Sequence, residues 1–125
     1  MTMTTAWWAV LLCTVMGAAQ NSKAPVLACH LQAIRAADRP RYHDLTKRLR
    51  TALQERSELP DGYAFHLDSQ VMSLPELAEW ISLERLCCPF FSFQLTVSGT
   101  QTGWLLKLTG PEGVKALLQT EFPAG

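Results

Sequence analysis

Apolar and polar residues alternate in several short stretches of this chain. In residues 26–34, Leu27, Cys29 and Leu31 fall on one side, while Ala28 and His30 fall on the other. Alternation with a period of two is typical of a strand that has one buried face. The pattern therefore predicts a first strand with Cys29 on its apolar side.

Three further stretches alternate in the same way, at residues 63–68, 93–98 and 104–108. The last two are separated only by a short glycine-containing loop, residues 99–103. Two strands joined by so short a loop pair as an antiparallel hairpin. The four stretches together predict a four-stranded sheet.

The segment after Asp38 changes to helical spacing. Asp38 is a good N-cap and Pro40 suits the first turn of a helix. The turn sequence LPDG at residues 59–62 is a strong helix breaker. We therefore expect a first helix that runs from Asp38 into the segment containing Glu55. Its apolar face consists of Tyr42, Leu45, Leu49, Ala52 and Leu53.

A second helix is predicted by a capping box, in which Ser73 is followed three residues later by Glu76, with Pro75 between them. This helix should run to Cys88, because Pro89 cannot continue it. A third helix is expected after the GPE sequence at residues 110–112, with an inner face of Val114, Leu117 and Leu118.

The predicted element order is β-α-β-α-β-β-α, which indicates the α+β class. Four strands and three helices form a two-layer sandwich when all helices cover one face of the sheet. The chain has 125 residues, 48% of them apolar, which suffices for one domain over residues 26–125. The 11 basic and 11 acidic residues balance, which excludes the large positive charge of a nucleic-acid-binding domain.

The start of the chain differs from the rest. Residues 6–19 carry no charge, and this run is too short for a transmembrane anchor. We expect a signal peptide at residues 1–19, cleaved after Ala19, then a flexible lead at residues 20–25. The mature protein would be periplasmic or secreted, without a membrane anchor. Since residues 1–5 have no Lys or Arg, a misplaced start site and a cytoplasmic location stay open.

Cleavage after Ala19 would remove Cys13 and leave Cys29, Cys87 and Cys88. An odd number of cysteines in an exported protein means that at least one thiol is free, bound to a metal or paired with another molecule.

The vicinal pair Cys87-Cys88 is the strongest chemical feature of the chain. On a helical wheel, Glu84 and Cys88 fall on the inward stripe of the second predicted helix, and Cys87 falls at its edge. A buried carboxylate needs a partner, and Arg85 lies close enough to the stripe to be predicted for that role.

Three thiolates would come together if the strand carrying Cys29 passes under the end of this helix. Such a cluster suits a soft ion, because soft ligands select soft metals. We therefore predict a site for mercury, arsenic(III) or copper(I), in which Cys29, Cys87 and Cys88 are the ligands. Glu84 and Arg85 would form the shell that supports them.

Two other functions stay open. A thiol redox protein or cysteine-dependent enzyme would use the same cysteines, and a structural or binding module would bury them or join them in a disulfide. A disulfide from Cys29 to Cys87 or to Cys88 is sterically easier than one between neighbours. Thioredoxin-like chemistry is disfavoured, because the chain has no C-x-x-C motif and a helix C-terminus raises the pKa of a thiol.

Four segments resemble a group of small bacterial proteins of unknown function with a C…CCPF pattern. They are ACHL at residues 28–31, DGYAF at 61–65, ERLCCPFF at 84–91 and LTGPEG at 108–113. The resemblance implies no established activity. It does imply that the positions to test are Cys29, Glu84, Arg85, Cys87 and Cys88.

Overall fold

The computed structural model describes residues 27–123. The predicted signal peptide at residues 1–19 and the lead at residues 20–25 lie outside the described residues. No helix within residues 27–123 is long and apolar enough to cross a membrane.

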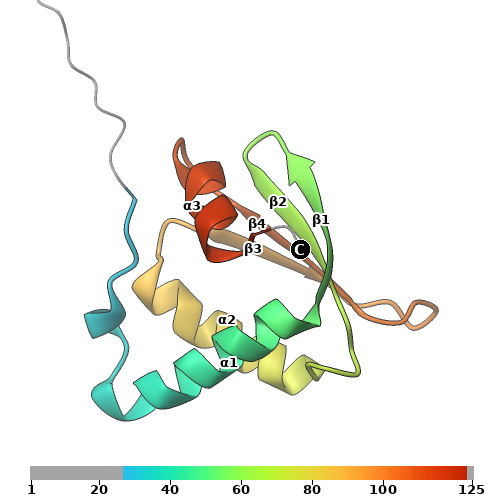
Figure 1. Ribbon diagram of the computed structural model, residues 1–125, viewed down its shortest axis with the longest axis horizontal. Coiled ribbons are helices and arrows are strands. Elements are labelled where there is room, and N and C mark those ends of the chain that lie inside the picture. Colours follow the sequence, from blue (N-terminus) through green and yellow to red (C-terminus); the bar gives the residue numbers. More distant parts are fainter. Residues whose placement is uncertain (1–26, 124–125) are drawn as a thin grey trace, which may run out of the picture.

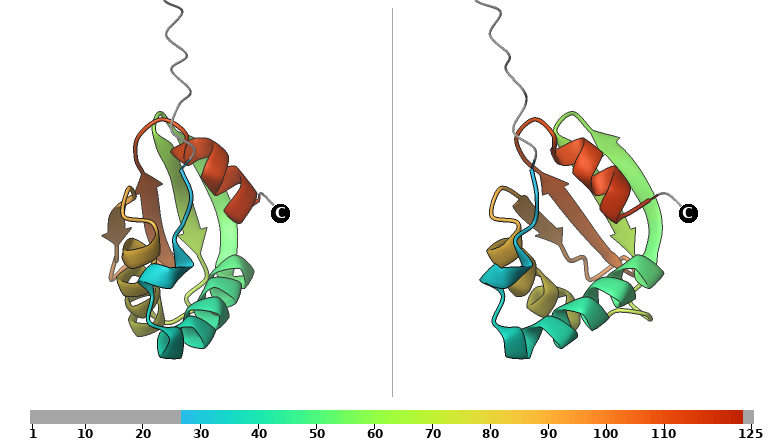
Figure 2. Two further views of the ribbon diagram at one scale, coloured as in Figure 1. Left: turned by 90° about the vertical axis from the view of Figure 1, so that its left-hand side faces the viewer. Right: turned by 60° about the vertical axis from the view of Figure 1, so that its left-hand side comes forward.

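The described chain forms a four-stranded antiparallel sheet with three helices on one face (Figures 1 and 2). The expected α+β class is therefore confirmed, with its four strands and three helices. The strand order in the sheet is β1-β2-β4-β3. The elements along the chain are α1 (Arg39–Ala52), β1 (Leu53–Leu59), β2 (Gly62–Leu67), α2 (Leu74–Cys87), β3 (Ser92–Thr96), β4 (Trp104–Thr109) and α3 (Val114–Glu121).

The first strand comes from a different segment than the alternation predicts. Residues 27–30 have no regular structure and are followed by two 3₁₀ turns, Leu31–Ala33 and Ala36–Asp38. The strand predicted at residues 26–34 is therefore wrong. The backbone N–H of His30 explains the difference, because it donates to the carbonyl of Cys87 at the end of α2 (2.8 Å) rather than to another strand.

Strand β1 lies where the helical pattern was expected to continue. The first helix stops at Ala52, and Leu53 takes an extended conformation at its C-cap. The polar sequence LQERSEL then pairs with β2 as one of the two edge strands of the sheet. An edge strand tolerates polar and charged side chains, so the segment carries no clear strand signal of its own.

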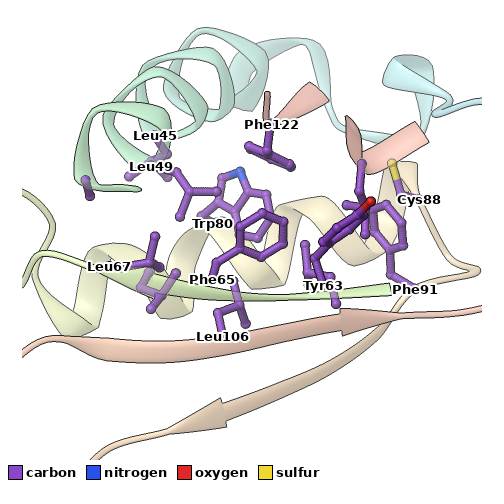
Figure 3. Packing of buried hydrophobic residues seen from close by; sticks show 14 of the residues in the cluster. Leu45, Leu49, Tyr63, Phe65, Leu67, Trp80, Cys88, Phe91, Leu106 and Phe122 are labelled. Atoms are coloured by element: carbon purple, nitrogen blue, oxygen red, sulfur yellow. The ribbon is translucent and has the colours of Figure 1, made fainter. Parts of the chain in front are cut away.

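The core lies between the helices and one face of the sheet (Figure 3). Trp80 of α2 is fully buried, and its indole N–H donates to the hydroxyl of Thr46 on α1 (3.1 Å). Its ring packs edge-on against Phe122, which in turn packs against Phe65 of β2. These contacts connect α2 to α1 and, through Phe122, to β2, so that one face of α2 is turned inward.

Helix α2 has the limits that the sequence predicts. Its N-terminus carries the complete capping box, in which Ser73 accepts from the backbone N–H of Glu76 and the Glu76 carboxylate accepts from the backbone N–H of Ser73. Its C-cap is Cys88, directly before Pro89. The inward face near this end consists of Trp80, Glu84 and Cys87.

Gly62 of β2 sits against the backbone of β4 with no room for a side chain. A Cβ at this position would lie 2.8 Å from the Cα of Thr109 and would overlap the carbonyl oxygen of Leu108. We predict that Gly62→Ala lowers the free energy of unfolding by about 3 kcal/mol, because the strand pair must shift to accommodate the methyl group. Urea denaturation measures this.

Gly99→Ala is the matched control, because a Cβ there meets nothing within 4 Å. It should change stability by no more than about 0.5 kcal/mol. Equal stabilities of the two variants would contradict the close approach of β2 and β4.

Candidate functional site

The three described cysteines meet at the C-terminal end of α2. Cys87 is the last residue of the helix and Cys88 is its C-cap. Cys29 comes from the irregular segment before Leu31, which runs past this end of α2 (Figure 2). The predicted convergence is therefore present, although the segment that supplies Cys29 is not a strand.

Cys29 and Cys88 are joined by a disulfide, with their Cα atoms 4.8 Å apart. This is one of the two pairings that the sequence left open, and the separation is in the usual range for disulfides. The hydrogen bond from His30 to the Cys87 carbonyl lies beside it. Cys87 keeps a free thiol that is 1% exposed.

The Cys87 thiol contacts three groups. Its Sγ lies 3.6 Å from the Sγ of Cys88, 3.6 Å from the Tyr42 hydroxyl and 4.0 Å from Oε2 of Glu84. The thiol donates to the Tyr42 oxygen, and the Tyr42 hydroxyl donates to Oε2 of Glu84 (2.8 Å). A thiol, a phenol and a carboxyl group thus form one hydrogen-bonded chain.

Glu84 is buried, as the helical wheel predicts, but its partner is Tyr42. Arg85 is exposed, and within residues 27–123 its guanidinium takes part in no ion pair or side-chain hydrogen bond. Successive helical residues point about 100° apart, so Arg85 is directed away from the Glu84 carboxylate. The predicted Glu84–Arg85 pair is therefore wrong.

Tyr42 is the site residue that sequence reasoning missed. It was placed on the apolar face of the first helix, and its ring does lie on the side of α1 that packs against α2. The available signal was the buried position predicted for Glu84, since a carboxyl group there requires a hydrogen-bond donor. A tyrosine on a neighbouring apolar face meets that requirement with its hydroxyl.

Burial dominates the electrostatics of the site. It raises the pKa of Glu84 to about 7, although the Tyr42 hydrogen bond acts in the opposite direction. Burial, and after it the charge of Glu84, also raises the pKa of the Cys87 thiol and that of the Tyr42 hydroxyl. At neutral pH Cys87 is therefore protonated, the opposite of an activated nucleophilic cysteine.

One sulfur each from Cys29, Cys87 and Cys88 and one carboxylate oxygen of Glu84 all lie within 4.8 Å of one another. A group of four donors this compact could hold a metal ion. In the oxidised protein two of the three sulfurs are bonded to each other, so the full set of thiolates exists only after reduction.

The disulfide should contribute strongly to stability, because it connects residues 59 positions apart. In the chain-entropy description, closing such a loop destabilises the unfolded state by about 4 kcal/mol. We predict that reducing wild-type protein lowers the free energy of unfolding by an amount of this order, measured by urea denaturation with and without a phosphine reductant. Cys29→Ser is the control, since reduction should leave its stability unchanged. Equal stability of oxidised and reduced wild type would contradict the cross-link.

Glu84 should also make stability depend on pH. Its pKa in the folded protein, about 7, is above the ordinary value of 4.5, so the folded state binds the proton more tightly than the unfolded state. The stabilisation is complete below pH 4.5 and is lost as the pH rises through 7. We predict that the free energy of unfolding of the oxidised protein falls by about 3 kcal/mol between pH 4.5 and 8.

Glu84→Gln should abolish most of this fall, because the amide does not titrate yet still accepts from Tyr42. Denaturation curves at several pH values measure it. An identical pH profile in the variant and the wild type would show that another group is responsible.

Comparisons of the chain with protein-family models, with curated proteins and with solved structures find no match. The functional argument therefore starts from the geometry of the cysteine cluster alone.

Proposed function

We propose that the reduced protein binds a soft metal or metalloid ion through Cys29, Cys87 and Cys88. The observation that carries the proposal is that the three sulfurs and a Glu84 oxygen all lie within 4.8 Å of one another. Soft ions such as mercury, arsenic(III) and copper(I) prefer thiolates, whereas hard cations prefer sets of oxygen ligands.

Binding and burial are compatible despite the raised pKa of Cys87. Burial disfavours a free thiolate, but a bound ion supplies the positive charge that stabilises the deprotonated form. The Tyr42–Glu84 hydrogen bond replaces the predicted Glu84–Arg85 shell. It keeps Tyr42 and Glu84 in place beside Cys87, as residues around a metal site commonly do for its ligands.

The proposed activity requires a reductant. A dithiol would reduce the Cys29–Cys88 disulfide with two electrons, so that two cysteine thiols form and the dithiol becomes a disulfide. In an oxidising compartment the disulfide persists, whereas a reducing compartment keeps the thiols free. Export, which the predicted signal peptide implies, would therefore preserve the Cys29–Cys88 disulfide. A cytoplasmic location would keep the thiols free for binding.

A second candidate function is thiol–disulfide exchange, favoured by the 3.6 Å distance between the sulfurs of Cys87 and Cys88. Attack by Cys87 requires its thiolate, which burial disfavours. The pH dependence of Cys87 alkylation separates the two functions. Half-maximal reactivity below the free-cysteine pKa of about 8.5 would favour exchange, and a higher value would favour coordination.

We predict that the reduced full-length chain binds one mercury(II) ion with thiolate charge-transfer absorbance in the ultraviolet. The oxidised chain and a Cys87→Ser plus Cys88→Ser variant should bind at least about tenfold more weakly, a difference of about 1.4 kcal/mol. Absorbance titration against a competing small dithiol measures both affinities.

Cys13→Ser is the matched control, because it removes a thiol outside the proposed ligand set. Its affinity should equal that of the wild type. Absence of a signal in fully reduced wild type, or the same signal in the double variant, would overturn the proposed function.

A further inference from the structure

In the part of the chain that the structure describes, no cationic side chain forms an ion pair with the cysteine cluster. Within residues 27–123, no ion pair involves Glu84, and the charges that act on Cys87 are those of Glu84 and Glu121. Of the groups that shift the pKa of Glu84, Arg50 has the smallest effect, and its guanidinium is already paired with Glu121 (3.2 Å). A bound complex must therefore be close to neutral by itself.

This requirement separates the soft ions by charge. Three thiolates carry three negative charges, so a monovalent ion leaves a complex of charge −2 and a divalent ion leaves −1. Coordination by the Glu84 carboxylate would add one more negative charge. Among complexes in which all three sulfurs bind as thiolates, only the one with a trivalent ion has zero charge. Cys87, Cys88 and Glu84 are buried, although Cys29 is not, and a net charge beside the buried groups is costly without a partner. The cluster therefore favours the trivalent ion.

The arrangement of the three sulfur atoms also suits a trivalent ion. The sulfur of Cys87 lies 3.6 Å from that of Cys88, and Cys29 is bonded to Cys88, so the three sulfurs form a compact triangle. Trivalent arsenic and antimony take three ligands in a pyramid, with a lone pair on the fourth side. Glu84 is then not needed as a ligand and keeps its hydrogen bond from Tyr42 (2.8 Å).

We infer that the site is adapted to arsenic(III) or antimony(III), bound by Cys29, Cys87 and Cys88 and not by Glu84. This inference rests on the proposed function. Arsenous acid has three hydroxyl groups, and each of the three thiols replaces one of them. Three As–O bonds break and three As–S bonds form, each hydroxide leaves as water with a thiol proton, and arsenic stays in the +3 state.

The experiment uses the full-length chain with Cys13→Ser, reduced with a phosphine and then freed of reductant without oxygen. Sodium arsenite is added, and native mass spectrometry measures the adduct. We expect a mass gain of one arsenic atom and a loss of three hydrogens, with all three cysteines protected from alkylation. Loss of only two hydrogens, or an alkylatable cysteine, would overturn the inference.

Glu84→Gln tests the role of the carboxyl group. Arsenite affinity, measured by competition with a small dithiol, should stay within about threefold of the parent chain. Cys87→Ser should reduce it by at least about tenfold. A tenfold loss in Glu84→Gln would show that the carboxylate is a ligand and would overturn the assignment.

Zinc(II) and mercury(II) provide the comparison that separates this inference from the proposed function. If either ion binds through the three cysteines while arsenite does not, the trivalent assignment falls and the proposed function stands. If the reduced chain binds none of these ions, both fall.

Discussion

The site depends on which group hydrogen-bonds to the carbonyl of Cys87 at the C-terminal end of α2. A helix leaves its last carbonyl groups without partners inside the helix, and Pro89 prevents the chain from adding another turn. The carbonyl of Cys87 takes the N–H of His30 instead. Because His30 follows Cys29 directly, this one backbone hydrogen bond brings the sulfur of Cys29 to that of Cys88. The disulfide then makes the contact covalent.

Three separate interactions hold α2 so that this end is well placed. The capping box of Ser73 and Glu76 fixes its start, and the buried ring of Trp80 fixes its rotation against α1 through Thr46. The third is the contact with the segment that carries Cys29. Glu84 lies between Trp80 and this last contact, and Cys87 lies at the contact itself. Both therefore face inward from a helix, and a site on a rigid element is positioned accurately.

The features that could be predicted are those encoded within a single element. Both limits of α2, the inward direction of Glu84 and the β3–β4 hairpin follow from local signals such as capping residues, periodicity and glycine loops. The convergence of the cysteines was also predicted, although through a strand that does not exist. The alternation of residues 27–31 reflects packing against the end of α2, not pairing in a sheet.

The features that could not be predicted depend on contacts between elements. The sequence LQERSEL is a strand because β2 is available to pair with it, and local propensity is overridden by such tertiary pairing. Tyr42 becomes the partner of Glu84 only because α1 packs on α2 at the correct rotation. Arg85 lay nearer in sequence, yet its position on the helix excludes it.

Burial favours the proposed ion binding over the proposed thiol–disulfide exchange. A catalytic thiol needs its charged form before any partner arrives, and around Cys87 that form is disfavoured by burial and by the charge of Glu84. Coordination has no such requirement, since the ion and the thiolates become neutral together and the deprotonated form never exists alone. The same low polarity that weakens a nucleophile therefore strengthens the preference for a ligand that cancels the charge of the sulfurs.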